Sequence, residues 1–251
     1  MMILIRKSKS FIRKLLNRIL YPDCYSSDRL VSALREKGCK IGNKVKFFHP
    51  ETNFIDSTRP YLLEIGNGAK ITRGVVILTH DFSFSVFRPV FHDNMNECSG
   101  KTIIGKNNFI GMGSVIMPGV HLGDNVIVGS GSVVTNSFPD NVVIAGNPAK
   151  VICTLEELYK RRKTRFLKDA ITQRDIIREI YKRDPTIKEM EGFYSLFMPR
   201  DLNILKSSGV NYRRSGDVED DILSDFMSSE PMFGSFEEFL GYANNAEDNQ
   251  S

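Results

Sequence analysis

A mainly β fold, a parallel β-helix of six-residue repeats, is the fold class that this sequence predicts. Residues 104–134 match themselves at a shift of eighteen positions, and within them an aliphatic residue recurs at every sixth position. A period of six fits neither a 3.6-residue helix nor the two-residue alternation of an ordinary strand. It fits a short strand followed by a tight bend, three times per turn, with successive turns stacked about 4.8 Å apart.

The recurring aliphatic residue is expected to point inward and to form a ladder along the stack. Its members are Ile104, Ile110, Ile116, Leu122, Val128 and Val134. A small or β-branched residue usually follows four positions later, at Ser114, Val120, Val126 and Ser132. The same period occurs upstream at Ile65, Ile71 and Ile77, and it begins at Ile41. In a β-sandwich, strands recur every 8 to 12 residues with drifting spacing, so the constant period favours the stack.

Helical segments are expected on both sides of the repeat. Three regions follow: an N-terminal helical segment (1–40), the repeat (41–152) with an inserted loop (79–102), and a C-terminal helical extension (153–251). Thr154 and Glu157 have the spacing of a capping box that opens a helix running through Arg174. A cap, a trimer brace and a partner-docking module are all open for the extension.

Composition narrows the class of protein. Among 251 residues, 34 are basic and 30 acidic, and this excess is too small to indicate a nucleic-acid partner. The four cysteines never form a C-x-x-C pair, so no zinc site or disulfide framework is predicted. No apolar run approaches the roughly 20 residues of a membrane span, and residues 3–5 are too short for a signal-peptide core. A cytoplasmic protein is expected.

Residues 1–20 predict an amphipathic basic helix. Phe11, Leu15 and Ile19 fall on one side, with Arg13 and Lys14 on the other. Such a helix suits the anionic inner face of a membrane, as a peripheral contact. Packing against the protein's own repeat, or against a neighbouring subunit, explains the same pattern equally well.

The repeat is interrupted once, between Ile77 and Ile104, and an insertion that leaves a rigid scaffold is a natural place for a site. His80 stands where the loop begins. Since imidazoles ordinarily titrate near pH 6.5, a neutral ring is available there as a general base. His92, within the loop, is the rival. To orient the base, Asp56 and Glu64 from the preceding turn are candidates.

Residues 104–133 and the segment A-G-N-P-A-K (145–150) resemble the hexapeptide-repeat acyltransferase superfamily, over about residues 41–152. The resemblance implies a left-handed β-helix, a homotrimer with sites between subunits, and acetyl-CoA as co-substrate without a metal. The segment T-H-D (79–81) is similar to the place where galactoside and serine acetyltransferases carry a catalytic histidine, which implies that role for His80.

The resemblance also implies a set of coenzyme contacts. Met112 or Gly113 would offer a backbone N–H to the oxyanion, and Lys150 would bind a coenzyme phosphate. Cys153 stands where some relatives have a second basic residue, which puts that part of the phosphate contact in doubt. The repeat itself needs small residues at most of these positions. The implied contacts are Met112, Gly113, Ser130, Gly131, Thr135, Ala145, Gly146, Pro148 and Lys150.

Three functions agree with these observations. The first is acetyl-CoA-dependent O-acetylation of a sugar hydroxyl in a glycan or its precursor, with His80 as base. The second is N-acetylation of an amino sugar, an amino acid or an antibiotic. The third is a non-catalytic β-helix that binds or assembles with a partner, because a repeat alone indicates a scaffold and not a reaction.

Overall fold

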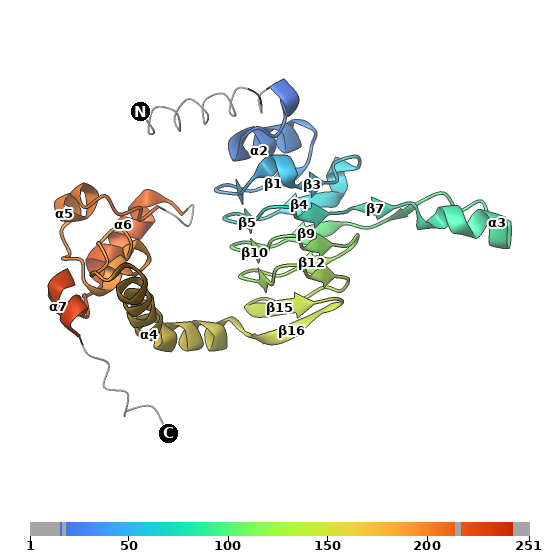
Figure 1. Cartoon of the computed structure of the whole chain (residues 1–251). Coiled ribbons are helices and arrows are strands. Elements are labelled where there is room, and N and C mark those ends of the chain that lie inside the picture. Colours follow the sequence, from blue (N-terminus) through green and yellow to red (C-terminus); the bar gives the residue numbers. More distant parts are fainter. Residues whose placement is uncertain (1–15, 17–18, 214–216, 243–251) are drawn as a thin grey trace. The chain divides into compact units, whose positions relative to one another are not determined.

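The structure, a computed structural model, describes residues 16, 19–213 and 217–242 (Figure 1). The chain divides into two compact units, residues 1–158 and 159–251. The basic helix predicted for residues 1–20 lies almost entirely outside the described residues. The first unit includes helix α2 (Ser27–Glu36), which begins where the Ser26 side chain accepts a hydrogen bond from the Arg29 N–H.

Short parallel strands of the first unit form three sheets, which the chain visits in rotation (Figure 1). Sheet A contains β1 (Lys40–Ile41), β4 (Leu63–Ile65), β9 (Thr102–Ile104) and β12 (His121–Leu122). Sheet B contains β2 (Lys46–Phe47), β5 (Lys70–Ile71), β10 (Phe109–Ile110), β13 (Ile127–Val128), β15 (Val142–Gly146) and the antiparallel β16 (Ala149–Thr154). Sheet C contains β3 (Phe54–Ile55), β6 (Val76–Ile77), β11 (Val115–Ile116) and β14 (Val133–Val134).

Strand register confirms the predicted shift of eighteen residues. Ile104 pairs with Leu122, Ile110 with Val128 and Ile116 with Val134, one pair in each sheet. All six side chains of this ladder are 0% exposed. Burying such aliphatic side chains stabilises the fold by about 1.5–3 kcal/mol each. The small residues predicted four positions later are also buried, and they fill the space beside each bend: Ser114, Val120, Val126 and Ser132.

Bends between the sheets repeat one backbone conformation at each corner. Between sheets A and B, an asparagine with positive φ recurs at Asn107, Asn125 and Asn141. Between sheets B and C, glycine takes that place, at Gly113 (φ 68°) and Gly131 (φ 70°). Both residue types tolerate the left-handed region better than others do, so these bends follow directly from the sequence.

The interruption of the repeat is a hairpin arm. Ile65 pairs with Ile104, 39 residues away, so the arm adds 39 − 18 = 21 residues to one turn. Strand β7 (His80–Asp81) pairs antiparallel with β8 (Cys98–Ser99), and between them lie a 3-10 turn (Ser83–Val86) and helix α3 (Phe87–Phe91). The arm extends away from the stacked strands (Figure 1). Its exposed apolar side chains are Phe82, Val86, Val90, Phe91 and Met95.

Helix α4 (Leu155–Tyr181) begins with the predicted capping box. The Glu157 carboxylate accepts from the Thr154 N–H (2.8 Å), and the Thr154 hydroxyl oxygen accepts from the Glu157 N–H (3.1 Å). The second unit continues with α5 (Leu202–Ser207), α6 (Glu219–Ser228) and α7 (Phe236–Gly241). Its core includes the stacked rings of Phe197 and Phe239, whose centroids are 5.4 Å apart.

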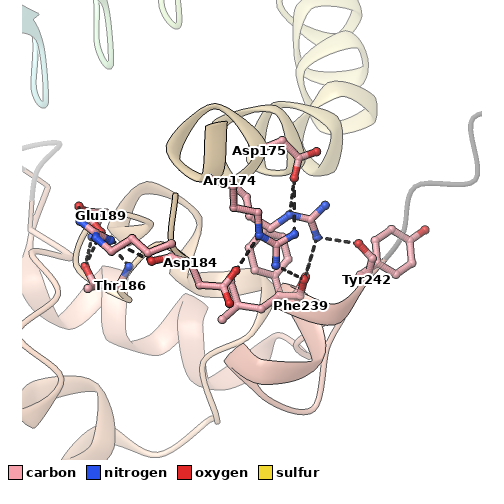
Figure 2. A network of polar contacts seen from close by, with 10 residues as sticks. Arg174, Asp175, Asp184, Thr186, Glu189, Phe239 and Tyr242 are labelled. Carbon is pink, nitrogen blue, oxygen red and sulfur yellow. Dashed lines mark hydrogen bonds and ion pairs between the residues drawn. The ribbon is translucent and has the colours of Figure 1, made fainter. Parts of the chain in front are cut away.

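A buried arginine ties α4 to the end of α7 in the second unit (Figure 2). Arg174 is 3% exposed, and its guanidinium donates to the carbonyls of Phe239 (3.0 Å) and Tyr242 (2.6 Å) and to the Asp175 carboxylate (2.8 Å). The last carbonyls of a helix have no partner within the helix. Arg174 therefore supplies donors at the end of α7, and Arg178 adds one more to the Leu240 carbonyl (2.7 Å).

Two features are absent from the described part of the chain. None of its helices combines the length and the apolar character that crossing a membrane requires. Within the same residues, no three His, Cys, Asp or Glu side chains are grouped closely enough to hold a metal ion.

Candidate active site

His80 lies where the chain leaves sheet C to begin the arm. Its side chain is 11% exposed, and its Nδ1 atom is 2.6 Å from Oδ2 of Asp56. The pairing of β3 with β6 explains this contact. Ile55 is opposite Ile77, so the residues that follow each strand, Asp56 and the His80 segment, lie on adjacent turns at the same edge.

Asp56 is 2% exposed and accepts hydrogen bonds from two threonines as well as from His80. The Thr58 hydroxyl (2.7 Å) and N–H (3.1 Å) donate to its Oδ1 atom. The Thr79 hydroxyl (2.5 Å) and N–H (3.0 Å) donate to its Oδ2 atom. Burial raises the pKa of Asp56, but the hydrogen bonds from Thr79, Thr58 and His80 outweigh it and hold this pKa well below the usual range. Asp56 is therefore ionised at neutral pH.

This network assigns the tautomer of His80. An ionised carboxylate only accepts hydrogen bonds, so Nδ1 must carry the proton that lies between the ring and Asp56. In the neutral ring with this tautomer, Nε2 keeps its lone pair and can accept a proton from another molecule. The ring is also held from the side by Phe82, whose centroid is 5.1 Å away at an interplanar angle of 86°. An imidazole held in one orientation by a buried carboxylate is the arrangement of a general base.

The other predicted acid–base residues lie elsewhere. Glu64 forms ion pairs with Lys40 (2.5 Å) and Lys101 (3.2 Å), and hydrogen bonds from these lysines lower its pKa. Of the two candidate carboxylates, Asp56 is the one that contacts His80. His92 is exposed at the end of α3, with φ 52°, and its N–H donates to the Arg88 carbonyl (2.9 Å).

Most of the predicted coenzyme contacts lie at the corner between sheets B and C, named here the coenzyme edge (residues 111–114, 129–132 and 146–148). The bends stack directly: the Gly113 N–H donates to the Arg73 carbonyl (3.0 Å), and the Gly131 N–H donates to the Met112 carbonyl (2.8 Å). Met112 is 56% exposed, and Ser130 is also exposed. At Gly113 and Gly131, no described heavy atom lies within 4 Å of where a Cβ would stand, so the edge has an open outer surface.

The remaining predicted contacts are placed on and beyond this edge. The Gly146 N–H donates to the Ser132 hydroxyl (3.2 Å), and Ala145 pairs with Lys150 across β15 and β16. Pro148 and Lys150 are exposed. Thr135 is also exposed but follows β14, so it lies at the far edge of sheet C, the edge that carries His80.

Within one chain, His80 and the coenzyme edge are on opposite edges of sheet C. Met112 precedes β11, whereas His80 follows β6, and the two strands are parallel. The length of the strand therefore separates His80 from the coenzyme edge. At about 3.3 Å per residue, this separation is on the order of 10–20 Å.

Four residues around His80 were missed by the sequence analysis. Thr58 and Thr79 hold Asp56, while Arg59 and Glu97 form an ion pair between the segment after Asp56 and the base of the arm. The signal for the threonines was a hydroxyl residue two positions after Asp56 and another just before His80. No local signal pairs Arg59 with Glu97, because they are 38 residues apart.

Comparison with known proteins agrees with this architecture. The family described as "Bacterial transferase hexapeptide (six repeats)" matches residues 101–136. Protein CapG of Staphylococcus aureus is 40% identical over 125 residues, which cover 49% of this chain and 70% of CapG. Galactoside O-acetyltransferase of Escherichia coli K12 is 38% identical over 112 residues, covering 43% of this chain and about half (51%) of that enzyme.

Among solved structures, a maltose O-acetyltransferase from Clostridium difficile 630 is 24% identical to this chain. The match covers 60% of this chain and 86% of that one, with a TM-score of 0.41. The six-residue ladder, the family match within it and the extent of the CapG similarity lead to one conclusion. This chain belongs to the hexapeptide-repeat acyltransferase superfamily.

Proposed function

We propose that this protein transfers the acetyl group of acetyl-CoA to a sugar hydroxyl of a glycan or glycan precursor, with His80 as the general base. The observation that carries the proposal is the 2.6 Å contact between His80 Nδ1 and Asp56, which leaves Nε2 able to accept a proton. Relatives that include a galactoside O-acetyltransferase, and a lipopolysaccharide O-acetyl transferase from Escherichia coli, support an acetyl donor and a sugar acceptor.

The reaction follows from these groups. His80 Nε2 removes the proton from the acceptor hydroxyl as its oxygen attacks the thioester carbonyl. Asp56 stabilises the imidazolium that forms. A backbone N–H stabilises the oxyanion, and Met112 is the better of the two candidates because the Gly113 N–H already donates to Arg73. When the carbon–sulfur bond breaks, the imidazolium returns its proton to the departing thiolate.

The acetyl-CoA site that we propose is the coenzyme edge. The open space outside Gly113 and Gly131 fits the narrow pantetheine arm. A side chain at either position would occupy this space, so glycine keeps it free. Further along, Lys150 is exposed and suits a phosphate of the coenzyme. Ala145, Gly146 and Pro148 would lie near the adenine end, as the family resemblance implies.

We further propose a left-handed β-helix that assembles as a homotrimer, with each site shared by two chains. The separation of His80 from the coenzyme edge supports this arrangement, since a thioester beside Met112 is too far from the His80 of the same chain. A neighbouring chain whose coenzyme edge approaches His80 completes the site. The exposed apolar side chains of the arm, such as Val90 and Phe91, suit burial against that neighbour.

His80→Ala tests the function directly. Release of coenzyme A thiol from acetyl-CoA is measured with a panel of sugars for the wild type, His80→Ala and the control His92→Ala. We expect His80→Ala to lower kcat by about 10²–10⁴-fold and His92→Ala to stay near wild type. Full transfer by the His80 variant would eliminate the base assignment, and an inactive wild type on every sugar would eliminate the acceptor class.

A further inference from the structure

The surface beside His80 carries three groups that the reaction itself does not use. Phe82 is 68% exposed, although its ring packs nearly perpendicular to the imidazole, with the two centroids 5.1 Å apart. Arg59 and Glu97 form an ion pair, and their side chains remain 26% and 43% exposed. An aromatic face and a polar pair next to a catalytic group, all accessible, are features of a binding surface.

The chain connectivity places the Arg59–Glu97 pair next to the base. Arg59 is three residues after Asp56, which contacts the His80 ring, and Glu97 directly precedes β8, whose Ser99 pairs with His80. The electrostatics agree: burial raises the pKa of Glu97, but Ser99, Arg59 and the nearby His80 outweigh it and lower this pKa.

We propose that Phe82, Arg59 and Glu97 form the acceptor subsite and that they select an uncharged pyranose. This inference rests on the proposed function and names the acceptor class for the same site. The carbon face of the sugar ring packs against Phe82, since aromatic rings bury apolar surface at little entropic cost. The guanidinium donates to, and the carboxylate accepts from, hydroxyls adjacent to the one that reacts at Nε2.

The charges of the subsite favour a neutral acceptor. Arg59 and Glu97 cancel each other, and Asp56 is buried behind His80. Asp81, whose carboxylate accepts from the Ser83 N–H (2.8 Å), adds a negative charge at the start of the arm. A carboxylate on the sugar would be repelled by Asp81 and would compete with Glu97 for Arg59.

Acceptor kinetics test the subsite. The probes are methyl glycosides of neutral hexoses, the matching uronic acids and the matching amino sugars, each assayed by thiol release. We expect neutral glycosides to be preferred over uronides by at least about tenfold in kcat/KM. Phe82→Ala and Glu97→Gln should raise the acceptor KM by about 10- to 100-fold and leave the KM of acetyl-CoA unchanged. Tyr159→Ala, which removes an exposed aromatic side chain of α4, is the matched control.

A variant in which the two charges of the ion pair are exchanged distinguishes acceptor recognition from a purely structural role of the pair. The double variant Arg59→Glu with Glu97→Arg restores the ion pair but reverses which loop presents the donor. We expect its acceptor KM to stay high. A wild-type KM in the swapped variant, an unchanged KM in Phe82→Ala, or a preference for uronides would overturn the subsite while leaving the acetyltransferase intact. A wild type that acetylates no sugar at all would count against both proposals.

Discussion

Among single residues, Asp56 connects the fold to the proposed chemistry. Its Oδ1 atom accepts two hydrogen bonds from Thr58 in a turn two residues long, a local device that short polar side chains often make. Its Oδ2 atom accepts from Thr79 and His80 on the next turn. One carboxylate thus closes its own loop and orients the base, so a change at Asp56 affects both stability and proton transfer.

The low pKa of Asp56 predicts a specific acid sensitivity. Because the folded pKa lies below the unfolded value of about 4, the ionised group stabilises the fold above that pH, and this stabilisation is lost as the pH falls toward the folded value. Asp56→Asn should be less stable than the wild type by about 2 kcal/mol at pH 5, and this difference should shrink toward pH 3. Urea unfolding at pH 5, 4 and 3 measures it. A constant difference would contradict the prediction.

Among the elements, the stacked turns use glycine for two different reasons. A Cβ on Gly105 would lie 2.3 Å from the carbonyl oxygen of Gly123 on the next turn, so glycine is required there by the close approach of two backbones. Gly131 has open space around it but a φ of 70°, so glycine is required there by the bend alone.

Because Gly105 is required by a close backbone approach and Gly131 by its φ, the two positions should tolerate substitution differently. Gly105→Ala should destabilise the fold by about 3 kcal/mol or more, because backbone must move to admit the methyl group. Gly131→Asn should cost less than about 1 kcal/mol, since asparagine already occupies positive φ at Asn107 and Asn125. Urea midpoints of the two variants provide the comparison. Equal losses would show that packing between turns does not distinguish the two positions.

Helix α7 depends on a single buried cation of α4. In Arg174→Met, the carbonyls of Phe239 and Tyr242 lose the guanidinium donor, and Phe239 keeps only the Tyr242 N–H (3.3 Å), while most of the side-chain volume remains (Figure 2). We expect a loss of about 3 kcal/mol in the local stability of α7. Hydrogen exchange of the α7 amides in the full chain measures this loss, with the exposed Arg165→Met as control. Protection of α7 that is equal in both variants would refute the role of Arg174.

For the molecule as a whole, the placement of His80 and the coenzyme edge predicts complementation between subunits. His80→Ala and Ser130→Trp should each be inactive, the second because its bulk fills the coenzyme edge. After subunit exchange at equal concentrations, a site has an intact base with probability one half and an intact edge with probability one half. About a quarter of wild-type activity should therefore return.

The matched control mixes His80→Ala with Asp56→Ala. Both substitutions fall on the same edge of one chain, so no exchanged site contains both intact groups, and activity should stay absent. No recovery in the first mixture would mean that each site is built from one chain only. Recovery in the control would contradict the pairing of His80 with Asp56 of the same chain.

The ladder and the bends were predictable because they are local and periodic. Between Ile104 and Val134, an aliphatic residue recurs every six positions, and each bend carries a residue suited to its φ. The residues of each turn therefore specify the geometry of that turn. The capping box at Thr154 was predictable for the same reason, since its two partners are three residues apart. The placement of His80 at the start of the arm also followed from the sequence, because a break in a period is visible without a structure.

The partner of His80 was not predictable. Asp56 and Glu64 both precede the histidine by about one turn, and the irregular segment 53–61 has no period that assigns its register. In the folded chain, Ile55 pairs with Ile77 in sheet C, which brings Asp56 to the His80 ring. Glu64 lies on sheet A instead and forms ion pairs with Lys40 and Lys101. The repeat thus determines the scaffold residue by residue. The contacts of the site arise between turns, from segments distant in sequence, and only the packed structure brings them together.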